Sequence, residues 1–566
     1  MNKKTIIWIV AAVLAVGAAV AAFMFASNGS SQEEAKSEET MSAAIVAYVD
    51  FGQLAEKGAL ENYITPENRK LLASTVAAQL GGTKEAKQLK DIITNLDALG
   101  IDTQSPLCCY VNTEMTDVVF VAKVLDVEKI DSSIELLSYF LEESGEEPLV
   151  VNTKGGVRTI DGYFYAVAYN ASTFAIACGS DTSLKVAQNA ISTQMDLSKF
   201  AGKDIAVMLN VDSLKKVLDE QMNNYRVEYE ELYEEDYITK SQYNEMLAAL
   251  DEYDEAMKEF NKYFEPNANI IISLTFDLGR ATLAFNVNGV KNNEYMDSFK
   301  TVNLAHLNNL SKDTYAVMGM GVNGERFAKY LEDMFTDDML KSLGIRPTSD
   351  VRMAMSIAAD AISSIDGDIT LALDSIDGTI KWDYDYYWEE YYSEPEVNSV
   401  DAMLMVDVND SYIINNVGQF AGGFFNKIDK NHYSLYYDGY DFNLGQDDGL
   451  LYAGVNMTPK SKRRSAMNAD WAKDVEGSLN YMVVNIDALL ANSFIREMWN
   501  DATNLSYEES LMMDNFLDMF SYAYIASSLA SSELVLVFDD QDTNALEQIS
   551  DAILPFLIDE CVENLY

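Results

Sequence analysis

The sequence predicts an α+β fold in which repeated strand–helix units and antiparallel hairpins form sheets that are covered by helices. Three observations lead to this prediction. Apolar strands recur with an Asn or Asp near their end, amphipathic helices follow them, and pairs of alternating strands flank short turns. The chain has 566 residues with 48% apolar side chains, which suffices for several cores. We expect two lobes, over residues 42–300 and 301–566.

The N-terminal segment predicts a transmembrane helix over residues 1–26, followed by a polar linker over 27–41. Lys3 and Lys4 precede an uncharged apolar run from Ile6 to Ala26. At about 1.5 Å per residue, this run would reach roughly 31 Å, the thickness of a bilayer core. Basic residues before the run and acidic residues after it place the body outside the cytoplasm. A cleaved signal peptide is the alternative, since Ala19-Val20-Ala21 resembles a cleavage site.

The repeated units are the basis of the fold prediction. In each, a short polar residue at the end of the strand can cap the helix that follows, by accepting a hydrogen bond from its first free N–H groups. The five strands that show this pattern are Ile45–Asp50, Ile205–Asn210, Ala316–Gly321, Leu404–Asp407 and Tyr481–Asn485.

Hairpins and one helical insertion complete the predicted architecture. Alternating strands flank Asp277–Arg280 and Asp377-Gly378, and Asp-Gly is a favoured hairpin turn. The stretch 211–263 is acidic, lacks Gly and Pro, and carries apolar residues at helical spacing. It therefore predicts a helical hairpin inserted in the first lobe.

The segment Gly319-Met-Gly321-Val-Asn-Gly324 matches the G-x-G-x-x-G pattern of dinucleotide-binding turns. The other units reach the same turn without glycines, and no acidic residue ends a parallel strand about 20 residues further on. We interpret the segment as a turn that opens a helix.

An aromatic run offers the candidate binding residues. Trp382, Tyr384, Tyr386 and Trp388 share one face of a predicted strand. They form either a flat platform for a sugar ring or a protein partner, or an ordinary sheet face covered by helices.

Composition excludes several classes of function. The chain has 40 Lys and Arg against 90 Asp and Glu, a net charge of −50 that repels nucleic acid. Only two histidines are present, which we place on the surface, and nucleophile, P-loop and zinc motifs are missing from the sequence. We therefore predict neither an enzyme nor a cofactor or metal site.

The segment between Asp438 and Asp448 has oxygen ligands that could hold calcium, but a polar hairpin turn fits the spacing better. Cys108, Cys109 and Cys178 either pair in an oxidising compartment or stay buried free thiols.

The order of these elements resembles a family of large exported bacterial proteins of unknown function, found chiefly in gut bacteroidetes. The residues that carry the resemblance are Ile45–Asp50, Leu96–Asp102, Ser105–Tyr110 and Leu343–Arg346. It implies export and an α+β body, and no activity.

These observations predict an extracytoplasmic protein of the cell envelope, anchored by one membrane helix, that binds or scaffolds a protein or glycan partner. Two alternatives stay open. One is a carboxylate-dependent hydrolase or glycan-binding protein that uses the Trp382–Trp388 platform, and the other is a carrier of a hydrophobic ligand.

Overall fold

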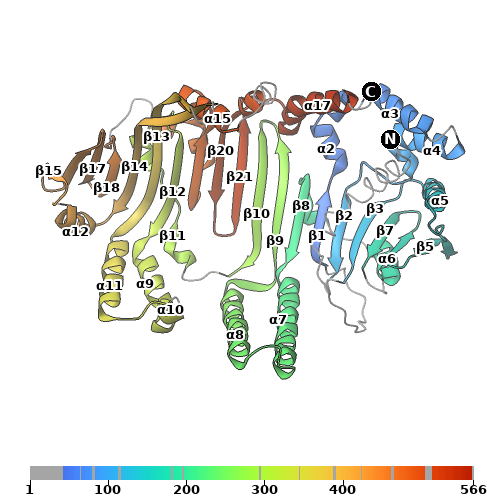
Figure 1. Cartoon of the computed structure of the whole chain (residues 1–566), viewed down its shortest axis with the longest axis horizontal. Coiled ribbons are helices and arrows are strands. Elements are labelled where there is room, and N and C mark those ends of the chain that lie inside the picture. The colour runs from blue at the N-terminus through green and yellow to red at the C-terminus, as the bar shows by residue number, and fades with distance from the viewer. Residues whose placement is uncertain are drawn as a thin grey trace. The chain divides into compact units, whose positions relative to one another are not determined.

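The computed structural model describes residues 43–563 except 64, 80–82, 113–115, 180–182, 194–196, 292–294, 343, 386–389, 422, 460–464 and 504–512. The described chain is a mixed α/β protein with extensive antiparallel sheet (Figure 1). It divides into two compact units. Unit 1 holds residues up to 260, 266–276 and the chain from 553, and unit 2 holds 261–265 and 277–552.

Unit 1 has one antiparallel sheet in the order β9-β8-β1-β2-β3-β7-β6-β5-β4. Its strands are β1 Ala43–Val49, β2 Leu107–Asn112, β3 Val118–Lys123, β4 Asn152–Lys154, β5 Val157–Asp161, β6 Tyr165–Tyr169, β7 Thr173–Cys178, β8 Ile205–Asn210 and β9 Phe264–Asp277. Its helices are α2 Phe51–Lys57, α3 Pro66–Gln79, α4 Lys84–Thr94, α5 Val127–Ser144, α6 Ser183–Ser192, α7 Val211–Glu234 and α8 Lys240–Tyr263.

Unit 2 repeats this order as β20-β19-β12-β13-β14-β18-β17-β16-β15, and β21 and β10 continue the sheet beyond β20. Its strands are β10 Arg280–Val290, β11 Phe299–Lys300, β12 Ala316–Asn323, β13 Ile365–Asp385, β14 Glu390–Val408, β15 Asn426–Lys427, β16 His432–Tyr437, β17 Tyr440–Asp447, β18 Leu450–Val455, β19 Asn480–Asn485, β20 Phe520–Ser527 and β21 Ser531–Phe538. Its helices are α9 Gly324–Met334, α10 Asp337–Ser342, α11 Ser349–Ser363, α12 Tyr412–Ala421, α13 Asp470–Asp474, α14 Ile486–Leu490 and α15 Ser493–Thr503, and α17 Ala545–Glu563 follows.

The fold-class prediction is wrong in two respects. In place of several sheets covered by helices, the described chain has a large antiparallel sheet, in which β1 pairs with β8 and β12 pairs with β19. This pairing satisfies backbone N–H and C=O groups that each strand would otherwise leave without partners at its edge. The predicted transmembrane helix is not supported either: no helix of the described chain has the length and apolar composition needed to cross a membrane, and Ile6–Ala26 lies outside the described residues.

Side-chain caps explain where four of the helices begin. The side chains of Asp50, Asn210, Asn323 and Asn485 accept hydrogen bonds from backbone N–H groups three residues on, at 3.0, 2.9, 3.3 and 3.2 Å. These caps stop the strands and start α2, α7, α9 and α14. Asp407 does not serve as the predicted cap, because β14 continues to Val408 and the carboxylate of Asp410 accepts from the N–H of Tyr412 instead.

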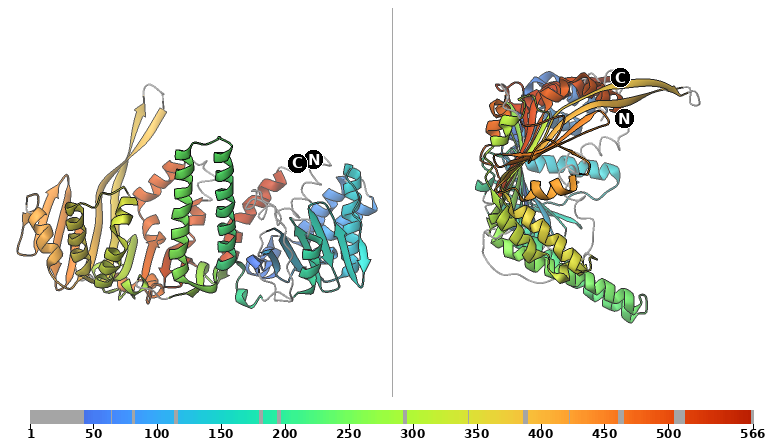
Figure 2. Two further views of the ribbon diagram at one scale, coloured as in Figure 1. Left: turned by 90° about the horizontal axis from the view of Figure 1, so that it is seen from below. Right: turned by 90° about the vertical axis from the view of Figure 1, so that its left-hand side faces the viewer.

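Two long antiparallel pairs stand out within the units. Helices α7 and α8 run side by side in the segment where the sequence predicts a helical hairpin, and Arg226 of α7 bonds to Asp251 and Asp254 of α8 (Figure 2). Strands β13 and β14 pair along most of their length as a long ribbon (Figure 2).

Candidate ligand pocket

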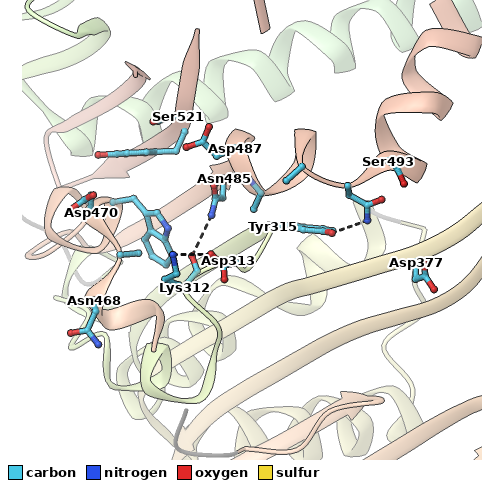
Figure 3. A pocket seen from close by; sticks show the side chains of 16 residues that line it. Lys312, Asp313, Tyr315, Asp377, Asn468, Asp470, Asn485, Asp487, Ser493 and Ser521 are labelled. Atoms are coloured by element: carbon cyan, nitrogen blue, oxygen red, sulfur yellow. Dashed lines mark hydrogen bonds and ion pairs between the residues drawn. The ribbon is translucent and has the colours of Figure 1, made fainter. Parts of the chain in front are cut away.

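An open pocket of about 760 Å³ lies in unit 2, beside the C-terminal end of β19 (Figure 3). Five parts of the chain form it: the loop before β12, strand β13, the segment around α13, the end of β19 with α14 and α15, and the start of β20. Its lining combines carboxylates, amides, hydroxyls and aromatic rings. The lining residues with such side chains are Asp313, Tyr315, Asp377, Asn468, Asp470, Trp471, Asn485, Asp487, Asn492, Ser493, Ser521 and Tyr522, together with Lys312.

Asn485 holds two walls of the pocket together. Its side-chain oxygen caps α14 through the N–H of Ala488, and its Nδ2 donates to the carbonyl of Lys312 at 3.4 Å. Its backbone N–H donates to the carbonyl of Tyr315 at 2.9 Å. The cap that ends β19 therefore also fixes the loop before β12.

Asn492 fixes the opposite wall. Its Nδ2 donates to the hydroxyl of Tyr315 at 2.8 Å and to the carbonyl of Ile376 at 2.6 Å. Its Oδ1 accepts from the N–H of Phe494 at the start of α15. In Figure 3, Asp377 and Ser493 lie on this side of the pocket, and Asp470, Asp487 and Ser521 lie on the other.

The pocket is acidic. Asp313, Asp377, Asp470 and Asp487 line it, and Lys312 is the cationic residue among the lining side chains, with its Nζ 3.3 Å from Asp313. Partial burial raises the pKa of Asp487, and repulsion from Asp539 and Asp518 adds to this shift. A hydrogen bond from Ser521 opposes it without reversing it.

Aromatic residues with buried polar groups line the pocket on its inner side. The hydroxyl of Tyr522 donates to Asp474 at 2.6 Å, and Arg280 bonds to both oxygens of Asp474 at 3.1 Å. Burial and the bond to Asp474 raise the pKa of Tyr522, so its hydroxyl stays protonated. The indole nitrogen of Trp471 is buried and has no hydrogen-bond partner among the described residues.

Among the residues that the structure describes, the lining of this pocket includes none of the predicted aromatic platform. The backbone of Trp382 and Tyr384 belongs to β13, where they pair with Ser393 and Tyr391. Tyr386 and Trp388, and the side chains of the whole run, lie outside what the structure describes. The platform stays a prediction.

The prediction that both histidines lie on the surface is wrong for His306, which is only 3% exposed. Its Nδ1 lies 2.9 Å from the hydroxyl of Thr370, and its Nε2 lies 3.0 Å from Oδ1 of Asp407. Oδ2 of Asp407 accepts from the N–H of Asp368. Thr370 is 1% exposed, so substrate cannot reach it and the set acts as a buried structural network.

His432 is half-buried on β16, with Asp429 and Asp447 on its two ring nitrogens at 2.8 and 3.1 Å. The candidate calcium segment forms two hairpin turns. Asp438-Gly439 and Asp448-Gly449 both have positive φ, as tight two-residue turns require. Within the described chain, no group of three His, Cys, Asp or Glu side chains is arranged to hold a metal ion.

Cys108, Cys109 and Cys178 are free thiols, of which Cys108 is buried and the other two are half-buried. Burial raises the pKa of Cys108 to about 11 and that of Cys109 to about 12. These thiols are therefore protonated at neutral pH and unreactive as nucleophiles.

Comparison with known proteins places the chain in a family. The model of a domain of unknown function, DUF4836, matches residues 40–546. The chain belongs to the DUF4836 family. The origin in gut bacteroidetes that the resemblance implied stays a prediction.

No curated protein is similar to the chain at a significant level. Among solved structures, crystal forms I and IV of TP0453 are similar to the chain, with 8% and 9% sequence identity. The two alignments cover 46% and 44% of the DUF4836 protein, and 80% and 77% of the TP0453 chains. Their TM-scores are 0.22 and 0.21, too low to inform on fold or function.

Proposed function

We propose that this DUF4836 protein is an extracytoplasmic binding protein whose pocket in unit 2 holds a saccharide. The observation that carries the proposal is the lining of the pocket, where carboxylate and amide oxygens converge with aromatic rings. Sugar hydroxyl groups donate to such oxygens, and the C–H faces of a sugar ring pack on aromatic rings. The rings of Tyr315, Trp471 and Tyr522 border the pocket but are only 9%, 3% and 8% exposed, so the carboxylates, amides and hydroxyls supply most of the proposed contacts.

The charge of the pocket favours a neutral or amino sugar over a phosphorylated ligand. Four aspartates line the pocket against one lysine, and that lysine already lies beside Asp313. A phosphate group would be repelled by this arrangement.

Calorimetric titration of the full chain with a panel of mono- and disaccharides tests the proposal. We expect one class of sugar to bind, and Asp470→Ala and Asp487→Ala each to weaken binding by about tenfold, roughly 1.4 kcal/mol. Asp333→Ala, on the exposed surface of α9, is the matched control and should bind as the parent does. The proposal fails if the parent binds no sugar, or if both pocket variants bind as tightly as the control.

The raised pKa of Asp487 favours a second candidate, a carboxylate-dependent glycoside hydrolase. A carboxyl group that stays protonated to higher pH can act as a general acid on a glycosidic oxygen, while another carboxylate serves as base or nucleophile. Hydrolysis of aryl glycosides by the parent but not by Asp487→Asn would support this function. Binding without turnover would leave the binding protein as the better description.

The proposed location rests on the N-terminal sequence, in which Lys3 and Lys4 precede the apolar run Ile6–Ala26, as in export signals. A reporter that is active only outside the cytoplasm, fused after Thr40, tests it. Reporter activity supports export, and activity of a matched cytoplasmic reporter at the same position contradicts it.

A further inference from the structure

One face of the unit 2 sheet carries a continuous row of apolar side chains. Across neighbouring strands these residues stand directly opposite one another, which places their side chains side by side along the row. In sheet order the row is Ala453, Leu404, Leu371, Met318, Met482, Ile525, Leu534 and Leu283. We call its six central residues, Leu404 to Leu534, the apolar face.

The apolar face is open to solvent. Its side chains are between 37% exposed, at Ile525, and 51% exposed, at Met318. The row two residues away on the same face is also free of charge, and it consists of Val455, Ala402, Leu373, Ala316, Val484, Ala523, Leu536 and Ala281. An antiparallel sheet that faces water normally alternates apolar and polar residues, so this face has the composition of a covered one.

The described helices of unit 2 leave this face largely uncovered. On the other side of the sheet, Val317, Ala372 and Val483 are each 1% exposed within the main core of the unit. On the side of the apolar face, α12 packs through Ile414 against Val406 and Leu451. This contact lies at the β14–β18 end, and the face from β13 to β21 stays exposed.

The exposed area is large enough for an interface. With about 200 Å² for a fully exposed side chain, the apolar face together with Met320 and Phe285 presents roughly 600 Å², at the upper end of what monomeric proteins expose. Two such faces packed together would bury roughly 1,200 Å², which reaches the lower limit for a stable protein–protein interface.

We propose that the apolar face is the interface between two copies of this chain, packed sheet on sheet. The chain has a net charge of −50, so two copies repel each other wherever their charged surfaces approach. An uncharged face can meet its own copy without that repulsion or the desolvation of an ion. A two-fold axis brings the same patch of both copies together, as in most homodimers, and stacked sheets lie about 10 Å apart. The flexible side chains of Met318 and Met482 adapt to such contacts.

Salt should strengthen this dimer. Screening reduces the repulsion between the two acidic bodies, while the apolar contact itself carries no ion pair. A dimer held by charge complementarity would weaken with salt, so the direction of the salt effect identifies the kind of interface.

Photo-crosslinking of the full chain tests the proposal. A benzoylphenylalanine at position 482, in the centre of the apolar face, should give a product of twice the chain mass on irradiation in the presence of phospholipid vesicles. The same residue at position 437, where Tyr437 is 69% exposed on β16, is the matched control and should give none. A product with the mass of one chain plus one lipid would overturn the proposal, because it would show that the face binds lipid. Recovery of unreacted monomer alone would overturn it as well.

Charge variants supply the second readout. Leu371→Glu and Ile525→Glu should each reduce the crosslinked product at least about tenfold, because they would place like charges in a dry interface. Tyr437→Glu should leave it unchanged. Both face positions are exposed, so circular dichroism of the variants should match the parent, and an unchanged crosslinking yield in both variants would contradict a face-to-face dimer. No residue of the saccharide pocket takes part, so this outcome is independent of ligand binding.

Discussion

Units 1 and 2 share one strand order, but the corresponding face of the sheet is half-buried in unit 1 and exposed in unit 2. In unit 1 the equivalent row runs through Ile272, Val207, Ala47, Cys109, Phe120, Ile176 and Val167, and none of these side chains is exposed. Helix α5, with 18 residues, packs on its end, whereas the corresponding helix α12 of unit 2 has 10. Both faces are apolar, but they differ in the strands as well as in their covering: unit 1 has Ala47 and Val207 where unit 2 has the larger Met318 and Met482.

The two units also differ after the strands β8 and β19. Both strands end in the same local pattern, Asn210-Val211-Asp212 and Asn485-Ile486-Asp487, and both asparagines cap a helix. In unit 1 a 24-residue helix follows, and Asp212 accepts from the N–H of Asn267 at 2.6 Å. In unit 2 the helix has five residues, and Asp487 lines the pocket. One capping pattern thus supports either a long helix or a binding site.

Breaking the buried ion pair of unit 1 should have the largest effect on stability. Asp204 is fully buried, bonds to Lys57 at 2.7 Å and accepts from the N–H of Phe276 at 2.7 Å. Lys57→Met leaves that carboxylate without its cation and should lower the free energy of unfolding of unit 1 by about 3–5 kcal/mol. Urea unfolding read by pulsed hydrogen exchange, peptide by peptide, resolves the units. Peptides of unit 2 and the variant Lys57→Arg are the controls, and a loss below about 1 kcal/mol would show that Asp204 does not depend on Lys57.

The corresponding experiment in unit 2 concerns its buried histidine. His306→Phe removes the partner of Asp407 and of the Thr370 hydroxyl, and should lower the free energy of unfolding of unit 2 by about 2–3 kcal/mol. His432→Phe is the matched substitution at a half-buried site and should cost less. Equal losses in the two variants, measured by the same urea titration, would show that the network around His306 contributes nothing specific.

The two capping asparagines should separate stability from binding. Asn210→Ala and Asn485→Ala each remove one cap and should cost their own unit about 1 kcal/mol. Only Asn485→Ala should also weaken ligand binding, because Asn485 holds the loop of Lys312 against the pocket. Calorimetric titration of both variants with the same ligand tests this. Equal affinities would show that Asn485 does not help to hold the pocket in its binding geometry.

The smallest expected effect is a pH dependence confined to unit 2. Burial alone would lower the pKa of His432, but hydrogen bonds to Asp429 and Asp447 raise it above its ordinary value of 6.5. A group with a raised pKa in the folded state stabilises fully below pH 6.5, and this contribution is lost as the pH rises through the raised pKa.

The urea midpoint of unit 2 peptides should therefore fall slightly from about pH 6 to about pH 8. His432→Gln should remove the fall. Unit 1 contains no histidine and serves as an internal reference. A fall of the same size in both units would have another origin.

Local features of the fold could be predicted from the sequence. Asp50, Asn210 and Asn485 cap helices as expected, because capping needs only a short polar side chain followed by a helix-forming stretch. The sharing of one sheet by distant strands could not be predicted, since any strand edge can accept another.

Long-range contacts account for the other differences. The G-x-G-x-x-G segment was interpreted as a turn, yet Gly319 and Gly321 lie inside β12. A Cβ atom at Gly321 would lie 2.2 Å from the carbonyl oxygen of Lys300, so this glycine allows close backbone packing. His306 can be buried because both of its ring nitrogens form hydrogen bonds, with Thr370 and Asp407. These partners are 64 and 101 residues away in the sequence. The pocket escaped prediction for the same reason, because its walls come from positions as far apart as Lys312 and Tyr522.

The shared strand order also constrains how the chain is made. In each unit, a central strand pairs with a strand that comes much later in the chain. Val49 of β1 pairs with Ile205 of β8, 156 residues further on. Met320 of β12 pairs with Asn480 of β19, 160 residues further on. Such pairings close slowly, because the intervening chain must first be ordered. During translation, neither half can finish its sheet until almost all of that half has left the ribosome, and until then its apolar strands need protection from aggregation.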